Sequence, residues 1–297
     1  MKISGRIHTI DIKNKLVGIL INKKIQFYYF QNSQMNLFKR YLYVGNWVEI
    51  EYDENHKIIK GKKEAFVVSF VYKISSIDKY NKIIYYDKKM LNTSLSNFLK
   101  SLGNIMVLDF EMTMPSYNFK GKGFKAEIIQ AGYMIINGEG EEITRYSKYI
   151  KPKLQPKLSK RAEDFLKLDS FEFEANAISY DEFYEEFSEV LDIYKPVILV
   201  YGKNDIIVLN DSYAINDKPS LSYKTRFINL CQLIKNYYDL RNDPGLFKLY
   251  KIYYDNQDIQ IHDAFNDSEV TALVFKAFKD EVNLKTNKVG CIRKELE

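Results

Sequence analysis

The sequence predicts an α/β domain preceded by a small all-β barrel. Up to about residue 75 the chain consists of short runs of β-forming residues separated by turn residues. After Leu102 the pattern changes, and apolar strands alternate with amphipathic helices, which is typical of an α/β layer fold. The hydrophobic fraction of 46% in 297 residues supplies enough apolar material for both cores. The expected parts are a barrel at 1–75, a connector with a helix at 76–102, the α/β domain at 103–280 and a C-terminal tail at 281–297.

The barrel is predicted from five short strands. They are Ile3–Ile10, Leu16–Ile21, Ile25–Phe30, Trp47–Tyr52 and Ala65–Ile74, and the breaks between them hold Lys13-Asn14, Asn22-Lys23, Gly45-Asn46 and Asp53-Glu54-Asn55. In the third strand, the period of two places Phe27 and Tyr29 on one face and Tyr28 and Phe30 on the other. We therefore expect one of these pairs in the core and the other exposed.

The α/β domain is predicted from strands that alternate with helices, after a connector helix at Ser94–Ser101. The expected strands are Ile105–Phe110, Glu127–Asn137, Thr144–Ile150, Val197–Tyr201 and Arg226–Asn229. The expected helices are Tyr180–Ile193, Ile206–Asn210, Leu230–Leu240 and Ala264–Phe278. This alternation favours a sheet covered by helices.

Composition and charge restrict the function classes. Residues 1–75 hold 13 Lys and Arg against 6 Asp and Glu, which indicates either a solvated surface or a patch that attracts phosphate.

The two cysteines, Cys231 and Cys291, stand far apart without ligand-like neighbours, which argues against a disulfide framework and a cysteine zinc site. The sequence has neither an apolar run of membrane-spanning length nor a basic start followed by an apolar run. We therefore expect a cytoplasmic protein.

The first acidic motif lies at the end of a buried strand. Asp109 and Glu111 follow the apolar run Ile105–Leu108, and their spacing of two places both side chains on one face. Two carboxylates there are costly unless a charge compensates them. A hard divalent cation such as Mg²⁺ or Mn²⁺ does so, because it takes oxygen ligands. A ladder of carboxylates on the surface is the alternative interpretation.

Two further elements carry acidic residues. Asp205 follows the apolar strand Val197–Tyr201, where it is suited to capping the next helix, to binding a metal, or to both. Asp211 is the alternative to Asp205. His262 and Asp267 open the last helix, and their spacing of five lets them border one cleft from successive turns.

In this order and spacing, the motifs resemble those of the DEDDh exonuclease superfamily. Leu108–Thr113 is similar to the first family motif, Glu127–Gly132 to the strand that follows it, and Ile261–Ala272 to the last motif. The resemblance covers about residues 104–280 and implies an RNase H-like mixed sheet flanked by helices. It also implies a metal-dependent 3′→5′ exonuclease that removes nucleoside 5′-monophosphates from the 3′ end of single-stranded nucleic acid.

The resemblance also implies roles for individual residues. The catalytic set is Asp109, Glu111, Asp205, His262 and Asp267, of which the four carboxylates hold two divalent cations, Mg²⁺ or Mn²⁺, and His262 is the general base. The expected contacts to the terminal nucleotide are Phe110, Met112 and Thr113, with packing roles as the alternative.

Two basic or aromatic segments are candidates for holding the strand. The loop Asn118–Lys125 offers Lys120 and Lys122 to a phosphate backbone, or is a hairpin connection with solvated lysines. The barrel resembles an OB-type, cold-shock-like domain, which implies that Phe27 and Tyr29 stack on bases. The second strand lacks the aromatic that such domains display there, so a structural barrel or one that docks a protein stays an alternative.

Other functions remain open at this point. RNA is slightly favoured over DNA as the substrate, because cold-shock-like domains often occur in proteins that act on RNA. A DNA proofreading or repair exonuclease is the alternative, since it uses the same chemistry. The distinction depends on contacts to the 2′-hydroxyl, which a motif does not reveal. A catalytically inactive nucleic-acid-binding protein is the third interpretation, although all four carboxylates and the histidine are present. The expected partners are single-stranded RNA or DNA 3′ ends and no membrane, with the oligomeric state open.

Overall fold

The computed structural model describes residues 1–77, 81–255, 263–284, 292 and 295–296. Two compact units divide the chain, Met1–Leu95 and Ser96–Glu297, and each is described by itself. Helix α2 (Lys88–Lys100) contains the boundary between them. Among the described residues, every helix is too short or too polar to cross a lipid bilayer.

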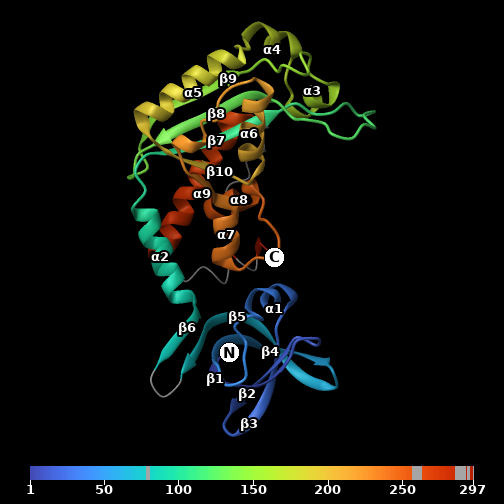
Figure 1. Cartoon of the computed structure of the whole chain (residues 1–297), viewed down its shortest axis with the longest axis vertical. Coiled ribbons are helices and arrows are strands. Elements are labelled where there is room, and N and C mark those ends of the chain that lie inside the picture. The colour runs from blue at the N-terminus through green and yellow to red at the C-terminus, as the bar shows by residue number, and fades with distance from the viewer. Residues whose placement is uncertain (78–80, 256–262, 285–291, 293–294, 297) are drawn as a thin grey trace. The chain divides into compact units, whose positions relative to one another are not determined.

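The first unit is a closed barrel of five strands (Figure 1). Its strands are β1 (Lys2–Asp11), β2 (Leu16–Ile21), β3 (Lys24–Tyr29), β4 (Trp47–Lys60) and β5 (Lys63–Ile77). β1 pairs with both β2 and β4, and a parallel pairing of β3 with β5 closes the ring. Helix α1 (Asn32–Phe38) follows β3, and β6 (Lys82–Asp87) extends the sheet beyond β5. The predicted small all-β barrel is confirmed, and its closed ring of five strands fits an OB-like domain.

The aromatic residues of β3 divide between the two faces of the strand as predicted. Tyr28 and Phe30 are fully buried in the barrel core, whereas Phe27 and Tyr29 are only partly buried. The expected turn at residues 53–55 is wrong, because β4 continues through it with a shift in register against β5. The chain turns later, where Gly61 and Lys62 both have positive φ, as a tight hairpin turn requires.

The second unit contains a mixed five-stranded sheet with the order β11-β10-β7-β8-β9. The strands are β7 (Ile105–Met112), β8 (Ile128–Ile136), β9 (Glu142–Tyr149), β10 (Val197–Val200) and β11 (Phe227–Asn229). β7 is antiparallel to β8 and parallel to β10, so the antiparallel and parallel halves of the sheet meet at β7. The predicted RNase H-like α/β fold is confirmed.

Helices cover both faces of this sheet (Figure 1). Their bounds are α3 (Lys160–Leu166), α4 (Ser170–Asn176), α5 (Tyr180–Tyr194), α6 (Asn204–Ile215), α7 (Leu230–Tyr238), α8 (Leu246–Tyr254) and α9 (Ala264–Leu284). On one face, Phe183 and Phe187 of α5 pack with the apolar residues of β7, β8 and α6. Truncation of one such buried ring to alanine typically costs about 3–5 kcal/mol. Helix α9 lies on the opposite face (Figure 1).

The sequence pattern left several elements unassigned. Helices α1, α3, α4 and α8 and strand β6 were not expected, and α2 begins six residues before the predicted start at Ser94. Helices α3 and α4 have only seven residues each, which is too few for a helical period to stand out. Caps fix their starts instead: the Ser159 side chain accepts the Ala162 N–H, and the Asp169 side chain accepts the Phe171 N–H.

Candidate active site

Strand β7 presents two carboxylates on the face of the sheet that α9 covers. Met106, Leu108 and Phe110 alternate into the core beneath α5 and α6. Asp109, which lies between Leu108 and Phe110, and Glu111, which follows Phe110, consequently point to the opposite face. The predicted shared face of these two carboxylates is therefore present in the structure.

The first turn of α9 adds a third carboxylate to this pair. Asp267 is 8% exposed, and oxygen atoms of Asp109, Glu111 and Asp267 all lie within 4.8 Å of one another. Residues separated by more than 150 positions in the sequence thus converge on one point. His262, the predicted general base, lies outside the described residues.

Asp205 reaches the same region from the first turn of α6. It is 4% exposed, and its Oδ1 accepts a hydrogen bond of 3.1 Å from the backbone N–H of Phe110, between the two acidic residues of β7. The suggested N-cap role is wrong, because α6 begins at Asn204 with Lys203 as its N-cap. Asp211, the alternative, is exposed on α6.

The electrostatics of the four carboxylates are those of a buried cluster of like charges. Burial, and then repulsion from Asp205, Glu111 and Asp267, raise the pKa of Asp109 well above its usual value. Burial and the neighbouring acids raise the pKa of Glu111 to about 8. For Asp205, burial raises the pKa to about 6, although the hydrogen bond from Phe110 opposes this change. The cluster therefore favours either bound protons or a bound cation.

The donor set fits a hard divalent cation. All four side chains offer carboxylate oxygens, the ligands that Mg²⁺ and Mn²⁺ prefer, and among the described residues no cysteine or histidine belongs to the group. Asp109, Glu111 and Asp267 are close enough to share one ion, and Asp205 lies beside Asp109. A cation bound at this position would compensate the charges that the fold brings together.

A sequence profile of the RNase T family, described as exonucleases, matches residues 106–275 of the chain. The matched range covers more than half of the sequence and contains all four carboxylates. The chain belongs to the RNase T exonuclease family. The predicted enzyme class, a DEDDh-type phosphodiester hydrolase, is thereby confirmed.

Relatives of this exonuclease agree with the family match. A probable 3′-5′ exonuclease KapD from Bacillus subtilis is 28% identical over 178 residues, which cover 60% of this chain and 85% of the relative. A 3′-exonuclease solved in a study of histone mRNA stem-loop recognition shares the fold with a TM-score of 0.54 and 15% identity, over 67% of this chain and 82% of that one. The nuclease domain of 3′hExo, a DEDDh family member bound to rAMP, has a TM-score of 0.53 and 18% identity over 62% and 95% of the two chains.

The start of α9 in this exonuclease is held by two residues whose roles the sequence did not reveal. The Gln130 side chain donates to Asp263 Oδ2 at 2.6 Å, and its oxygen accepts the Ala264 N–H at 3.3 Å. A Cβ atom at Gly132 would stand 2.2 Å from backbone atoms of Ala264 and Phe265. A glycine inside an otherwise apolar strand is the signal that could have indicated this close approach of the backbone.

The predicted nucleotide contacts differ in their accessibility. The Phe110 ring is 3% exposed and packs edge-on against Phe183, so it belongs to the core and does not face the site. Thr113 is buried, and its Oγ1 accepts the Glu127 N–H at 3.0 Å. Met112 is partly buried at the end of β7. Two further predicted contacts, Lys120 and Lys122, are exposed in the connection between β7 and β8. The last two, Phe27 and Tyr29 of the barrel, are partly buried.

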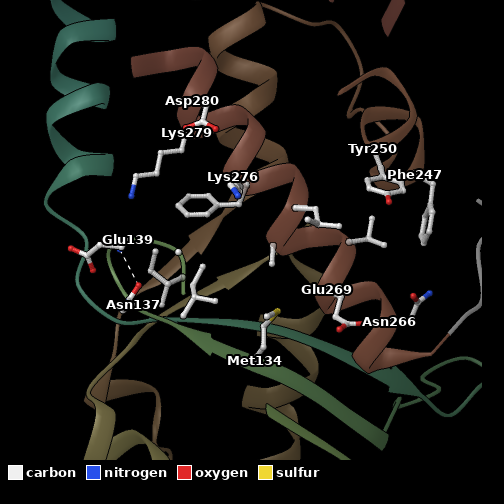
Figure 2. A pocket seen from close by; sticks show the side chains of 17 residues that line it. Met134, Asn137, Glu139, Phe247, Tyr250, Asn266, Glu269, Lys276, Lys279 and Asp280 are labelled. Atoms are coloured by element: carbon white, nitrogen blue, oxygen red, sulfur yellow. Dashed lines mark hydrogen bonds between the residues drawn. The ribbon is translucent and has the colours of Figure 1, made fainter. Parts of the chain in front are cut away.

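A hollow of about 940 Å³ elsewhere in the exonuclease unit does not contain the site. Figure 2 shows Phe247 and Tyr250 of α8 lining it together with Lys276 and Lys279 of α9. None of the four carboxylates lines it. Its walls combine apolar side chains with lysines and with the acids Glu139, Glu269 and Asp280. Among the described residues, the acids that converge closely enough to share a metal ion are Asp109, Glu111 and Asp267, so the carboxylate cluster is the better candidate for catalysis.

Proposed function

We propose that this exonuclease is metal-dependent and removes nucleoside 5′-monophosphates from the 3′ end of single-stranded nucleic acid, with RNA slightly favoured. The observation that carries the proposal is the convergence of Asp109, Glu111 and Asp267 within 4.8 Å, with Asp205 beside them. The similarity to KapD, a probable 3′-5′ exonuclease, supports the 3′→5′ direction.

The proposed division of roles follows from the chemistry of the side chains. Asp109, Glu111, Asp205 and Asp267 would hold two divalent cations, Mg²⁺ or Mn²⁺. When bound, such ions orient the scissile phosphate, stabilise the leaving 3′ oxygen and lower the pKa of the attacking water. His262 is proposed to take the proton of that water, because an imidazole has an unperturbed pKa near 6.5.

The chain's own contacts place these carboxylates before any ligand arrives. The Phe110 N–H holds the Asp205 carboxylate against β7, and Gln130 fixes the turn that carries Asp267. Sites built on strands and helices keep their geometry better than sites on loops. Folding therefore offsets the free-energy cost of placing four carboxylates close together. The negative charge that results favours the binding of a cation.

The barrel is proposed to bind the single strand that the exonuclease unit shortens. Phe27 and Tyr29 lie on the outer face of β3, and the Lys63 ammonium group stands 4.3 Å from the centre of the Phe27 ring. Aromatic rings beside cations are the usual elements of sequence-tolerant stacking on bases. Tethering would raise the local concentration of substrate without changing the chemistry.

The test is digestion of matched 5′-labelled single-stranded RNA and DNA with Mg²⁺ or Mn²⁺, together with an EDTA control. We expect a ladder that shortens from the 3′ end, needs the metal ion and forms somewhat faster on RNA. Faster cleavage of DNA would move the assignment to a proofreading or repair exonuclease. Binding of both strands without cleavage of either would support the binding-protein alternative instead.

A further inference from the structure

Two segments of the exonuclease unit are rich in basic residues and contain no acidic residue. Residues 114–126, which follow β7, hold three lysines, and residues 151–161, which follow β9, hold four lysines and one arginine. The whole chain, in contrast, has 39 acidic residues against 44 lysines and arginines. A local excess of one sign of charge attracts ligands of the opposite sign.

A buried carboxylate joins the two segments. Glu127, the residue that directly follows the first segment, accepts hydrogen bonds of 2.6 to 3.0 Å from the backbone N–H groups of Lys153, Leu154 and Gln155. The Gln155 side chain donates in turn to the carbonyl of Lys125 at 3.1 Å. One acidic residue thus fixes three consecutive amides of the second segment against the first.

Two more hydrogen bonds extend this junction away from β7. Ser159 Oγ donates to the Met114 carbonyl at 2.8 Å, and the Tyr117 hydroxyl donates to Asp164 Oδ2 at 3.4 Å. Figure 1 shows the connection between β7 and β8 extending beside α3. The segments therefore form one surface, the basic ledge, defined as residues 114–126 and 151–161. Its first residue lies three positions beyond Glu111.

Most of the basic side chains of the ledge form no ion pair within the part of the chain that the structure describes. Lys153 pairs with Asp217 at 2.8 Å, and Lys160 pairs with Asp164 at 3.1 Å. Within the ranges that the structure describes, the other six basic side chains of the ledge form no ion pair and are exposed: Lys120, Lys122, Lys125, Lys151, Lys157 and Arg161. These cations are free to meet an anionic ligand.

We propose that the basic ledge, whose two segments are joined through Glu127, holds the backbone phosphates of the nucleic-acid strand upstream of the nucleotide that is cleaved. This inference rests on the proposed function and deepens it. Contacts to phosphates give affinity and register but carry no sequence information. The ledge therefore serves RNA and DNA alike, and any preference for RNA arises elsewhere.

The experiment measures binding of a labelled twelve-nucleotide RNA, and of DNA with the same sequence, by fluorescence anisotropy in EDTA over a series of salt concentrations. The variant Lys157→Gln/Arg161→Gln removes two unpaired charges of the ledge. The matched control Lys251→Gln/Lys276→Gln removes two exposed charges from α8 and α9. EDTA prevents metal-dependent cleavage, so the measurement does not depend on the proposed hydrolysis.

For the ledge variant we expect affinity to fall at least about five-fold and the slope of log K against log salt to shrink by about 0.7 for each lost contact, equally for RNA and DNA. The control should keep the wild-type slope. An unchanged slope in the ledge variant, or a loss confined to RNA, would overturn the inference. Because binding is read without turnover, failure here and failure of the digestion test are separate results.

Discussion

Gly132 on β8 pairs directly with Asp109 on β7, and this pairing places the start of α9 beside the carboxylates. Because Gly132 has no side chain, the backbone of Ala264 and Phe265 approaches the sheet at this point. Asp267 stands one helical turn further along α9, where its oxygens come within 4.8 Å of those of Asp109 and Glu111. The convergence of these three carboxylates therefore depends on the absence of a side chain at Gly132.

Substitution of Gly132 by alanine should weaken both stability and hydrolysis. The new Cβ would lie 2.2 Å from the Ala264 carbonyl carbon and the Phe265 nitrogen, so α9 must move away from β8. Overpacking of this kind typically costs about 1–3 kcal/mol. Thermal unfolding and the rate of 3′-terminal release measure the two effects. Gly103→Ala is the matched control, since no atom lies within 4 Å of its added Cβ, and equal behaviour of the two variants would contradict the account.

The stability of the metal-free protein should fall as the pH rises. The folded state raises the pKa of Glu111 from 4.5 to about 8, so this residue stabilises the fold fully below pH 4.5, and the contribution is lost as pH rises towards 8. The melting temperature in EDTA should accordingly be lower at pH 8 than at pH 5, and Mn²⁺ should restore it at pH 8.

Glu111→Gln tests the origin of this pH dependence. The amide cannot ionise, so the difference in melting temperature between pH 5 and pH 8 should become smaller, and Mn²⁺ should stabilise the variant less. If the variant keeps the full wild-type difference in melting temperature between pH 5 and pH 8, then titratable groups other than Glu111 cause the pH dependence.

Asp205 and Asp211 lie on the same helix and allow a matched comparison. Asp205→Asn keeps an oxygen for the Phe110 N–H but removes a metal-binding charge, so hydrolysis should fall at least about 100-fold, beyond the range typical of residues that only support a ligand. Asp211→Asn, on the exposed face of α6, should retain the wild-type rate. The opposite order in a metal-dependent digestion assay would transfer the fourth ligand to Asp211.

The aromatic residues on the outer face of β3 should contribute to substrate affinity rather than to turnover. Replacing Phe27 and Tyr29 by alanine is expected to raise KM for a long single strand, since each stacked base is worth about 1–3 kcal/mol. The value of kcat should change little. Tyr43→Ala, an exposed aromatic in the same unit, is the control. Equal KM values for the double variant and the control would favour a structural or protein-docking barrel.

The sequence was sufficient for the fold class because the relevant patterns are local. Alternation along β7 placed Asp109 and Glu111 on one face, and the same period separated Tyr28 from Phe27. The short helices α3 and α4 escaped prediction because their seven residues make only two turns, and their caps determine them.

The supporting contacts of the site could not be read from the sequence. These contacts are hydrogen bonds between residues that lie far apart along the chain, such as Gln130 with Ala264 and Glu127 with Leu154. The burial of Phe110 could not be derived either, because the packing of α5 against β7 decides which residues of the motif remain accessible. The metal ligands themselves, the role of His262 and the nucleotide contacts stay predictions.

The most direct test of the metal site is Asp109→Asn, which exchanges one carboxylate oxygen for an amide at nearly constant shape. Release of the 3′-terminal nucleotide from 5′-labelled RNA is followed over a Mn²⁺ series, with Mn²⁺ binding measured by calorimetry and folding checked by circular dichroism. We expect a folded protein with weakened Mn²⁺ binding and hydrolysis reduced at least about 100-fold. A folded variant that binds Mn²⁺ and shortens RNA at the wild-type rate would contradict it.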